Sequence, residues 1–222
     1  MRKAFTMLEL VFVIVVIGVL AATIIPNIKS NPLREAAIQV VSHIRYTQHL
    51  AMMDNKYNFD NNKWFMKRWQ IIFGKSNSTN QQWAYTIFSD NAGSSGHSNP
   101  SLSEIAKDPL RNGVDSSTST AKLLSGGYSG VLKSTNKRAN KKMNLGMSYG
   151  VTDVSMSGGC LSSNVRISFD AMGRPIQRPL DSYLTAYKQS RLIKSTCNVI
   201  LSDQSSSITI AIEPETGYTH IL

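Results

Sequence analysis

The chain has 222 residues and a formal net charge of +10, and 41% of its residues are hydrophobic. This length suits one membrane element and one folded domain, and the Ser-, Asn-, Gly- and Thr-rich composition beyond the first quarter favours a loop-rich β domain over a helical bundle. The basic charge permits binding to nucleic acid, to anionic lipid or to acidic protein surfaces, and it does not choose among them.

The N-terminal stretch is apolar but contains one carboxylate. Residues 10–25 are uncharged and almost wholly apolar, and Arg2 and Lys3 precede them. A helix over residues 5–25 would be about 32 Å long, roughly the hydrocarbon thickness of a bilayer. The positive-inside rule then places the N-terminus in the cytoplasm and everything after Asn27 on the far side. Glu9 needs an explanation, because a carboxylate at mid-bilayer costs about 2.5–3.5 kcal/mol.

Three interpretations of this stretch compete. A secretory signal peptide would end at Val19-Leu20-Ala21, which supplies a small-residue cleavage site. The apolar run continues past that site, however, and a plain single-span anchor also leaves Glu9 without a purpose. The third interpretation, a processed filament subunit, accounts for both features.

The segment Lys3-Ala4-Phe5-Thr6-Met7-Leu8-Glu9 resembles the processing site of type IV pilins and of the pseudopilins of type II secretion. The resemblance covers about the first 27 residues, with Ala4 where Gly is usual. It implies that residues 1–4 are a leader, that a prepilin peptidase cleaves between Ala4 and Phe5, and that the new Phe5 amine is methylated. Glu9 would then meet the Phe5 amine of a neighbouring subunit in the membrane, where opposite charges attract strongly.

Residues 26–56 predict an amphipathic continuation of the helix. Pro26 and Pro32 can bend it, and Asn31-Pro32 equally suits the N-cap and first turn of a new helix. His43 and His49 are expected to serve in packing and not as metal ligands. Apolar residues recur at helical spacing at Leu33, Ala37, Val40, Val41, Ile44 and Ala51.

From about Trp64 the hydrophobic pattern becomes that of strands. The candidate strands are 69–73, 83–88, 164–169, 197–201, 207–212 and 218–221. Residues 160–222 resemble the GspH/FimT-type minor pseudopilins and minor pilins, whereas the segment 77–156 has no counterpart there. The expected fold class is α+β and pilin-like, with a long N-terminal helix, half transmembrane and half amphipathic, packed on an antiparallel β-sheet. Residues 57–222 form its β-rich domain.

The two cysteines are Cys160 and Cys197. Neither lies in a CxxC motif or a Cys/His cluster, which disfavours zinc. If the domain lies outside the cytoplasm, a disulfide between them is expected and would stabilise the fold by about 3–4 kcal/mol. Two buried free thiols are the alternative.

The chain offers little for catalysis. The stretch from Gly146 through Ser148 to Gly150 matches the G-x-S-x-G pattern, but the following VTDVSMSGG is not helical, as a nucleophile elbow would require. There is no H-E-x-x-H, P-loop or GxGxxG motif. We therefore expect no enzymatic activity, no cofactor and no metal.

A basic run is the stronger candidate for a binding site. Its five cations occur without an intervening acid at Lys133, Lys137, Arg138, Lys141 and Lys142. Such a run can contact phosphates with a steep salt dependence, and a solubilising loop or a contact with an acidic partner is the alternative. Lys188, Arg191 and Lys194 form a second cluster.

By resemblance, the expected function is that of a minor pseudopilin or pilin in a type II secretion or type IV pilus-like filament, which drives transport across the outer membrane. The chain would be a single-pass inner-membrane protein with a cytoplasmic N-terminus and a periplasmic C-terminal domain. Its partners would be other pseudopilins or pilins, the prepilin peptidase and the inner-membrane assembly platform. The alternative is a DNA-binding minor pilin of a DNA-uptake pilus, with nucleic acid as a further partner.

Overall fold

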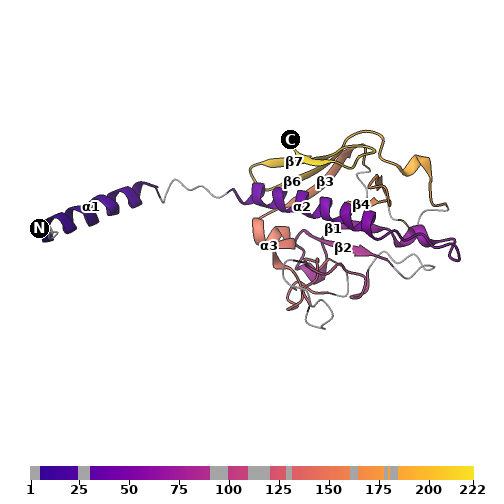
Figure 1. Cartoon of the computed structure of the whole chain (residues 1–222), viewed down its shortest axis with the longest axis horizontal. Helices are drawn as coiled ribbons and strands as arrows, with labels where there is room; N and C mark the ends of the chain where they lie inside the picture. Colours follow the sequence, from indigo (N-terminus) through magenta and orange to yellow (C-terminus); the bar gives the residue numbers. More distant parts are fainter. Residues whose placement is uncertain are drawn as a thin grey trace, which may run out of the picture. The chain divides into compact units, whose positions relative to one another are not determined.

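The computed structural model describes residues 6–24, 31–90, 100–109, 121–128, 132–160, 165–177, 180 and 185–222. The chain divides into two compact units, one ending at Asn31 and the other beginning at Pro32. Each unit is described by itself, and Figure 1 shows the elements of both. The expected leader, residues 1–4, lies outside the described residues.

The first unit contains helix α1, Met7–Ile24. Apolar residues occupy all sides of this helix, and Glu9 in the first turn is its single charged residue. Among the residues that the structure describes, no helix combines the length and the apolar character needed to cross a membrane. The expected span begins at Phe5 and ends at Ile25, both outside the described residues, so it stays a prediction.

The second unit begins with helix α2, Pro32–Met53. Proline suits a first helical position because its missing N–H would have no partner there. The expected apolar stripe is buried in full, and Ala36 and Thr47 join it. The single long helix that we expected is not described: α1 ends at Ile24, α2 starts at Pro32, and residues 25–30 lie outside the described part.

The protein is α+β, and its strands form two four-stranded antiparallel sheets where we expected one. The first sheet has the order β2-β1-β4-β5 and the second has the order β3-β6-β7-β8. The strands of the first sheet are β1 (Trp69–Gly74), β2 (Ala84–Ser89), β4 (Arg166–Phe169) and β5 (Pro175–Gln177). Those of the second are β3 (Asp153–Gly158), β6 (Cys197–Ser202), β7 (Ser207–Ile212) and β8 (Thr219–Ile221).

Six of the eight strands follow the predicted ranges, and β3 and β5 were not predicted. The sequence of β3, DVSMSG, has only two large apolar residues and ends in glycine, and β5 has only three residues. Both strands are formed by pairing with a stronger neighbour, β3 with β6 and β5 with β4. Pairing of this kind is tertiary context, which outweighs weak local preference.

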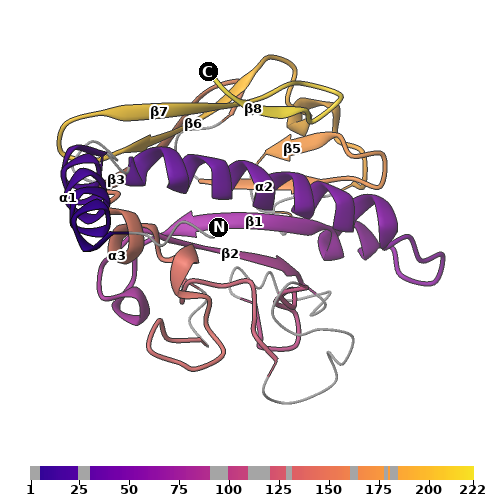
Figure 2. The same cartoon turned by 60° about the vertical axis from the view of Figure 1, so that its left-hand side comes forward.

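Helix α2 holds the two sheets together. It contacts β1 and β4 of the first sheet and β6, β7 and β8 of the second. Figure 2 shows α2 lying across the boundary between the sheets, with β1 and β2 on one side and β6 to β8 on the other. Its buried stripe therefore joins the inner faces of both sheets in one hydrophobic core.

Described parts of the segment 77–156 cover the outer edge of β2. Three isolated bridges run along this strand, from Ala84 to Asn144, from Thr86 to Ser125 and from Phe88 to Ile105. The same segment contains a separate small hydrophobic cluster, formed by Ile105, Leu123, Leu132 and Ala139. Covering an edge in this way removes an open template for strand pairing. The same segment contains η3 (Asn77–Thr79), η4 (Lys141–Met143) and α3 (Leu145–Tyr149).

Candidate functional site

The predicted assembly residue Glu9 takes part in the N-terminal cap of α1. Its Oε2 accepts hydrogen bonds from the backbone N–H of Thr6 at 3.0 Å and from the Thr6 hydroxyl at 2.9 Å. The Thr6 Oγ1 in turn accepts from the backbone N–H of Glu9 at 3.3 Å. This reciprocal arrangement is a capping box, and the T-x-x-E signature at Thr6–Glu9 could have revealed it in the sequence.

The two carboxylate oxygens of Glu9 are therefore not equivalent. Both described hydrogen bonds to the carboxylate use Oε2, which leaves Oε1 able to accept from another group. The predicted processing residues, Ala4 and Phe5, lie outside the described residues. One carboxylate can thus fix the start of the helix and still offer an oxygen to a cation.

The predicted basic run lies between two residues that bridge to β2, Ser125 and Asn144, in turns and in η4. The four lysines Lys133, Lys137, Lys141 and Lys142 are exposed. Arg138 differs from them, because its side chain is partly buried and its Nε donates to the carbonyl of Ala121 at 3.0 Å. The run therefore exposes four lysines to solvent, whereas its arginine also connects the run to the segment at Ala121 by a hydrogen bond.

A hollow of about 390 Å³ lies within this run. Its lining combines one cation, an exposed thioether and several hydroxyl or amide groups, from Ser134, Thr135, Lys141, Asn144, Met147 and Ser148. Ser148, the serine of the G-x-S-x-G pattern, lies within the five-residue helix α3 and donates its hydroxyl proton to the carbonyl of Lys141 at 2.7 Å.

The polar side of α2 fixes the end of the basic run. Gln39 Nε2 donates to the carbonyl of Lys142 at 2.9 Å and to the hydroxyl of Tyr85 at 2.7 Å. Gln39 Oε1 accepts from the hydroxyl of Tyr149 at 2.9 Å. One glutamine thus connects α2 to β2, η4 and α3.

His43 belongs to the same network. Its Nδ1 lies 2.7 Å from the Tyr85 hydroxyl, which also accepts from Gln39, and the tautomer of the imidazole sets which of the two groups donates. Burial lowers the pKa of His43 from 6.5 to about 4, and the negative charge of Asp108 partly opposes this. Burial also raises the pKa of Tyr85. Both groups are therefore neutral near pH 7, and His43 serves in packing as expected.

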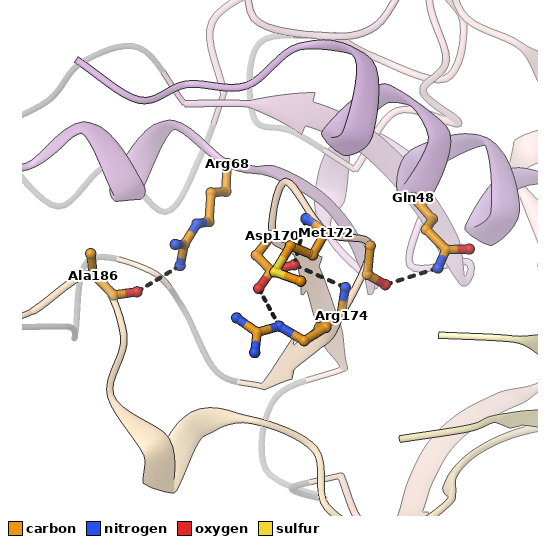
Figure 3. Close-up of polar contacts among 7 residues, drawn as sticks. Gln48, Arg68, Asp170, Met172, Arg174 and Ala186 are labelled. Atoms are coloured by element: carbon orange, nitrogen blue, oxygen red, sulfur yellow. Dashed lines mark hydrogen bonds and ion pairs between the residues drawn. The ribbon is translucent and has the colours of Figure 1, made fainter. Parts of the chain in front are cut away.

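A second polar centre joins α2 to two turns, and Figure 3 shows the contact of Gln48 with the first of them. Gln48 Nε2 donates to the carbonyl of Gly173, between β4 and β5, at 2.8 Å. The same nitrogen donates to the carbonyl of Thr216, between β7 and β8, at 2.7 Å. Each turn belongs to a different sheet, so this amide links both sheets to the helix. Nothing in the local sequence around Gln48 indicates this role.

The first of these turns is organised by Asp170. Its Oδ1 accepts from the backbone N–H groups of Met172 and Arg174, both at 2.9 Å, and its Oδ2 accepts from Arg174 Nε at 2.8 Å. The Asp170 side chain is 3% exposed and that of Arg174 is 30% exposed. The turn therefore holds the arginine side chain in one orientation with one edge of its guanidinium group still accessible.

The expected disulfide is present between Cys160 and Cys197. It joins the chain just after β3 to the first residue of β6, beside the pairing of Gly158 with Cys197. Among the described residues, no three His, Cys, Asp or Glu side chains gather in a way that could hold a metal ion. The cysteines thus serve the second sheet and not a metal centre.

No protein family model, no curated protein and no solved structure matches this chain.

Proposed function

We propose that the protein is a pilin-like filament subunit of the inner membrane, matured by cleavage between Ala4 and Phe5 and assembled through α1. The Thr6–Glu9 capping box at the start of an otherwise uncharged apolar helix carries the proposal. A helix that is apolar on all sides needs apolar surroundings that it cannot supply itself. A bilayer and then a bundle of identical helices provide them.

Glu9 would serve two purposes in such a helix. Through Oε2 it caps the first turn, and through Oε1 it receives the Phe5 amine of the adjoining subunit. Pairing the two charges in a medium of low dielectric constant offsets the cost of desolvating each of them. It also fixes the axial register of neighbouring subunits, as buried polar groups do in coiled coils.

Two substitutions separate these purposes. Glu9→Gln retains a side chain that can complete a capping box but removes the charge, whereas Glu9→Ala removes both. We expect both variants to be cleaved, to stay in the membrane and to be absent from sheared or cross-linked filaments. If Glu9→Gln enters filaments as well as the wild type and Glu9→Ala does not, Glu9 is only a helix cap.

Sequencing the N-terminus of the membrane-bound protein tests the processing step. We expect the mature chain to begin with N-methylated Phe5. A mature chain beginning at Ala22 would instead identify a secretory signal peptide, and an uncleaved chain would identify a plain anchor.

DNA binding by the basic run is a second candidate function, favoured by the exposure of its four lysines, of which Lys141 also lines the hollow. Each phosphate that a lysine neutralises releases counterions, so the affinity should fall steeply with salt. A gel-shift titration at several salt concentrations tests this with a variant in which Ala replaces Lys133, Lys137, Lys141 and Lys142. Arg138 is kept in this variant because its Nε bonds to Ala121. Equal retention of DNA by this variant and the wild type would remove the candidate.

A further inference from the structure

Two adjoining hollows lie along β5 at the side of the first sheet, and we call them together the arginine cleft. The first has a volume of about 200 Å³ and the second about 260 Å³. Arg174 and Leu192 line both of them. The segment at Leu192 and Ile193 forms the outer wall and is held against β5. Leu192 pairs with Ile176, and the N–H of Ile193 donates a hydrogen bond to the carbonyl of Pro175.

Arg174 presents an oriented guanidinium group at the centre of the cleft. Its Nε is held by Asp170, and in the described part of the chain neither of its terminal nitrogens makes a hydrogen bond. A guanidinium group fixed in this way still offers terminal N–H donors, which match the two oxygens of a carboxylate. Little side-chain entropy would be lost on binding because the arginine is already ordered.

Two further cations line the first hollow. Arg68 lies with its guanidinium carbon 5.0 Å from the ring centre of Trp64 and 5.2 Å from that of Tyr187, and it donates to the carbonyl of Ala186 at 2.9 Å. Figure 3 shows the guanidinium groups of Arg68 and Arg174 extending into the same space beside Ala186. Lys188 adds an exposed ammonium group. Among the described residues that line the first hollow, Asp170 is the one acid, and its oxygens already accept hydrogen bonds from the turn.

The remaining surface of the cleft is largely apolar. Ile176, Ala186 and Leu192 line the first hollow, and Pro175, Leu192 and Ile193 line the second. In the second hollow Glu215 is the one acid among the lining residues that the structure describes. Each hollow is smaller than the roughly 300–1,000 Å³ typical of small-molecule sites. Their sizes suit single side chains better than a cofactor.

We propose that the arginine cleft binds an extended segment of a partner protein in which acidic and apolar residues alternate. An acidic side chain enters the first hollow and pairs with Arg174, and an apolar side chain enters the second hollow against Leu192 and Ile193. Single-stranded nucleic acid fits less well, because its bases stack on aromatic rings and, in the described part of the lining, Tyr187 is the one aromatic residue. The proposal does not depend on membrane insertion or on filament assembly.

Fluorescence anisotropy with the full-length protein in detergent tests this proposal. The probe is a fluorescein-labelled peptide in which Glu alternates with Leu, and the matched probe has Gln in place of every Glu. We expect saturable binding of the first peptide and at least roughly tenfold weaker binding of the second, as expected for loss of a charge-assisted pair. Equal affinities for the two peptides would overturn the proposal.

Variants of two exposed lysines locate the binding. Lys188→Glu reverses a charge at the first hollow and should weaken binding of the Glu-Leu peptide, whereas Lys194→Glu makes the same change at an exposed lysine that does not line either hollow. Arg174→Lys keeps the charge but loses the planar fork, and it should also weaken binding. If Lys188→Glu and Lys194→Glu weaken binding of the peptide equally, its affinity depends only on the net charge of the protein and not on the arginine cleft. Displacement of the peptide by a stronger-binding oligothymidylate would assign the cleft to nucleic acid and also overturn the proposal.

Discussion

Gln48 in α2 donates its side-chain amide to the carbonyl of Gly173 across 125 positions of sequence, at 2.8 Å. The same nitrogen donates to Thr216. The two carbonyls belong to turns of different sheets, so α2 is joined to both sheets by polar contacts as well as by its apolar stripe. This connection also sets the position of the turn from which Arg174 extends.

Replacing Gln48 with alanine should destabilise the second unit by about 1–2 kcal/mol, because both carbonyls lose their donor. Urea denaturation of wild type and variant measures the difference. Ser42→Ala, at an exposed position of the same helix, is the matched control and should change stability by less than about 0.5 kcal/mol. Equal effects of the two substitutions would mean that the bonds to Gln48 contribute nothing.

Gly217, in the turn between β7 and β8, should tolerate alanine poorly. Its φ is +63°, and a Cβ there would lie 2.5 Å from Gln48 Nε2 and 2.6 Å from the carbonyl oxygen of Gly173. We expect Gly217→Ala to cost about 2–3 kcal/mol, from left-handed backbone strain and from displacement of Gln48.

Gly150 is the control for backbone strain alone. Its φ is +71°, but in the described part of the chain no atom lies within 4 Å of an added Cβ. Gly150→Ala should therefore cost about 1 kcal/mol. Thermal or urea unfolding of both variants compares them, and a cost at Gly150 as large as that at Gly217 would exclude the steric contribution.

The disulfide should stabilise the second sheet. The cysteines are 37 positions apart, and closing a loop of this size contributes about 4 kcal/mol in the chain-entropy model. A variant with serine at both Cys160 and Cys197 should unfold at a lower urea concentration than the oxidised wild type. Reductant should lower the wild-type midpoint toward that of the variant and leave the variant unchanged. If reductant also lowers the urea midpoint of the serine variant, its effect on the wild type cannot be assigned to the disulfide.

Stability should decrease in acid because of His43. In the unfolded chain this histidine protonates near pH 6.5, whereas in the folded protein burial lowers its pKa to about 4. Above pH 6.5 it is neutral in both states and contributes no pH dependence. As the pH falls from 6.5 to 4 the unfolded state takes up the proton first, so stability decreases by up to about 3 kcal/mol.

His43→Gln tests this origin of the acid sensitivity. Glutamine can still accept from the Tyr85 hydroxyl but does not titrate, so the decrease between pH 6.5 and 4 should become smaller. Denaturant titrations at a series of pH values give the two profiles. An unchanged slope in the variant would assign the acid sensitivity to other groups.

Features that depend on local periodicity and residue type could be predicted from the order of the residues. The 3.6-residue spacing of apolar positions predicted the buried stripe of α2, and period-two alternation predicted six strands, because each pattern places apolar groups on one side of its element. With two cysteines outside any metal-binding motif, a disulfide between Cys160 and Cys197 was expected on the condition that the domain lies outside the cytoplasm, and the structure contains it. The Thr6–Glu9 capping box could also have been read from four consecutive residues.

Features that depend on contacts between distant parts of the chain could not be predicted in this way and appear in the folded protein. The polar strand β3 exists because β6 pairs with it, and Arg138 differs from the neighbouring lysines because Ala121 comes within reach of its Nε. Gln48, Asp170 and Arg68 are ordinary polar residues in a linear pattern. Their roles depend on the fold, which brings the turns at Gly173 and Thr216 to Gln48 and the carbonyl of Ala186 to Arg68. A hydrogen bond needs a short distance and a favourable angle between its atoms, and the order of residues in the chain does not show which distant atoms meet this condition.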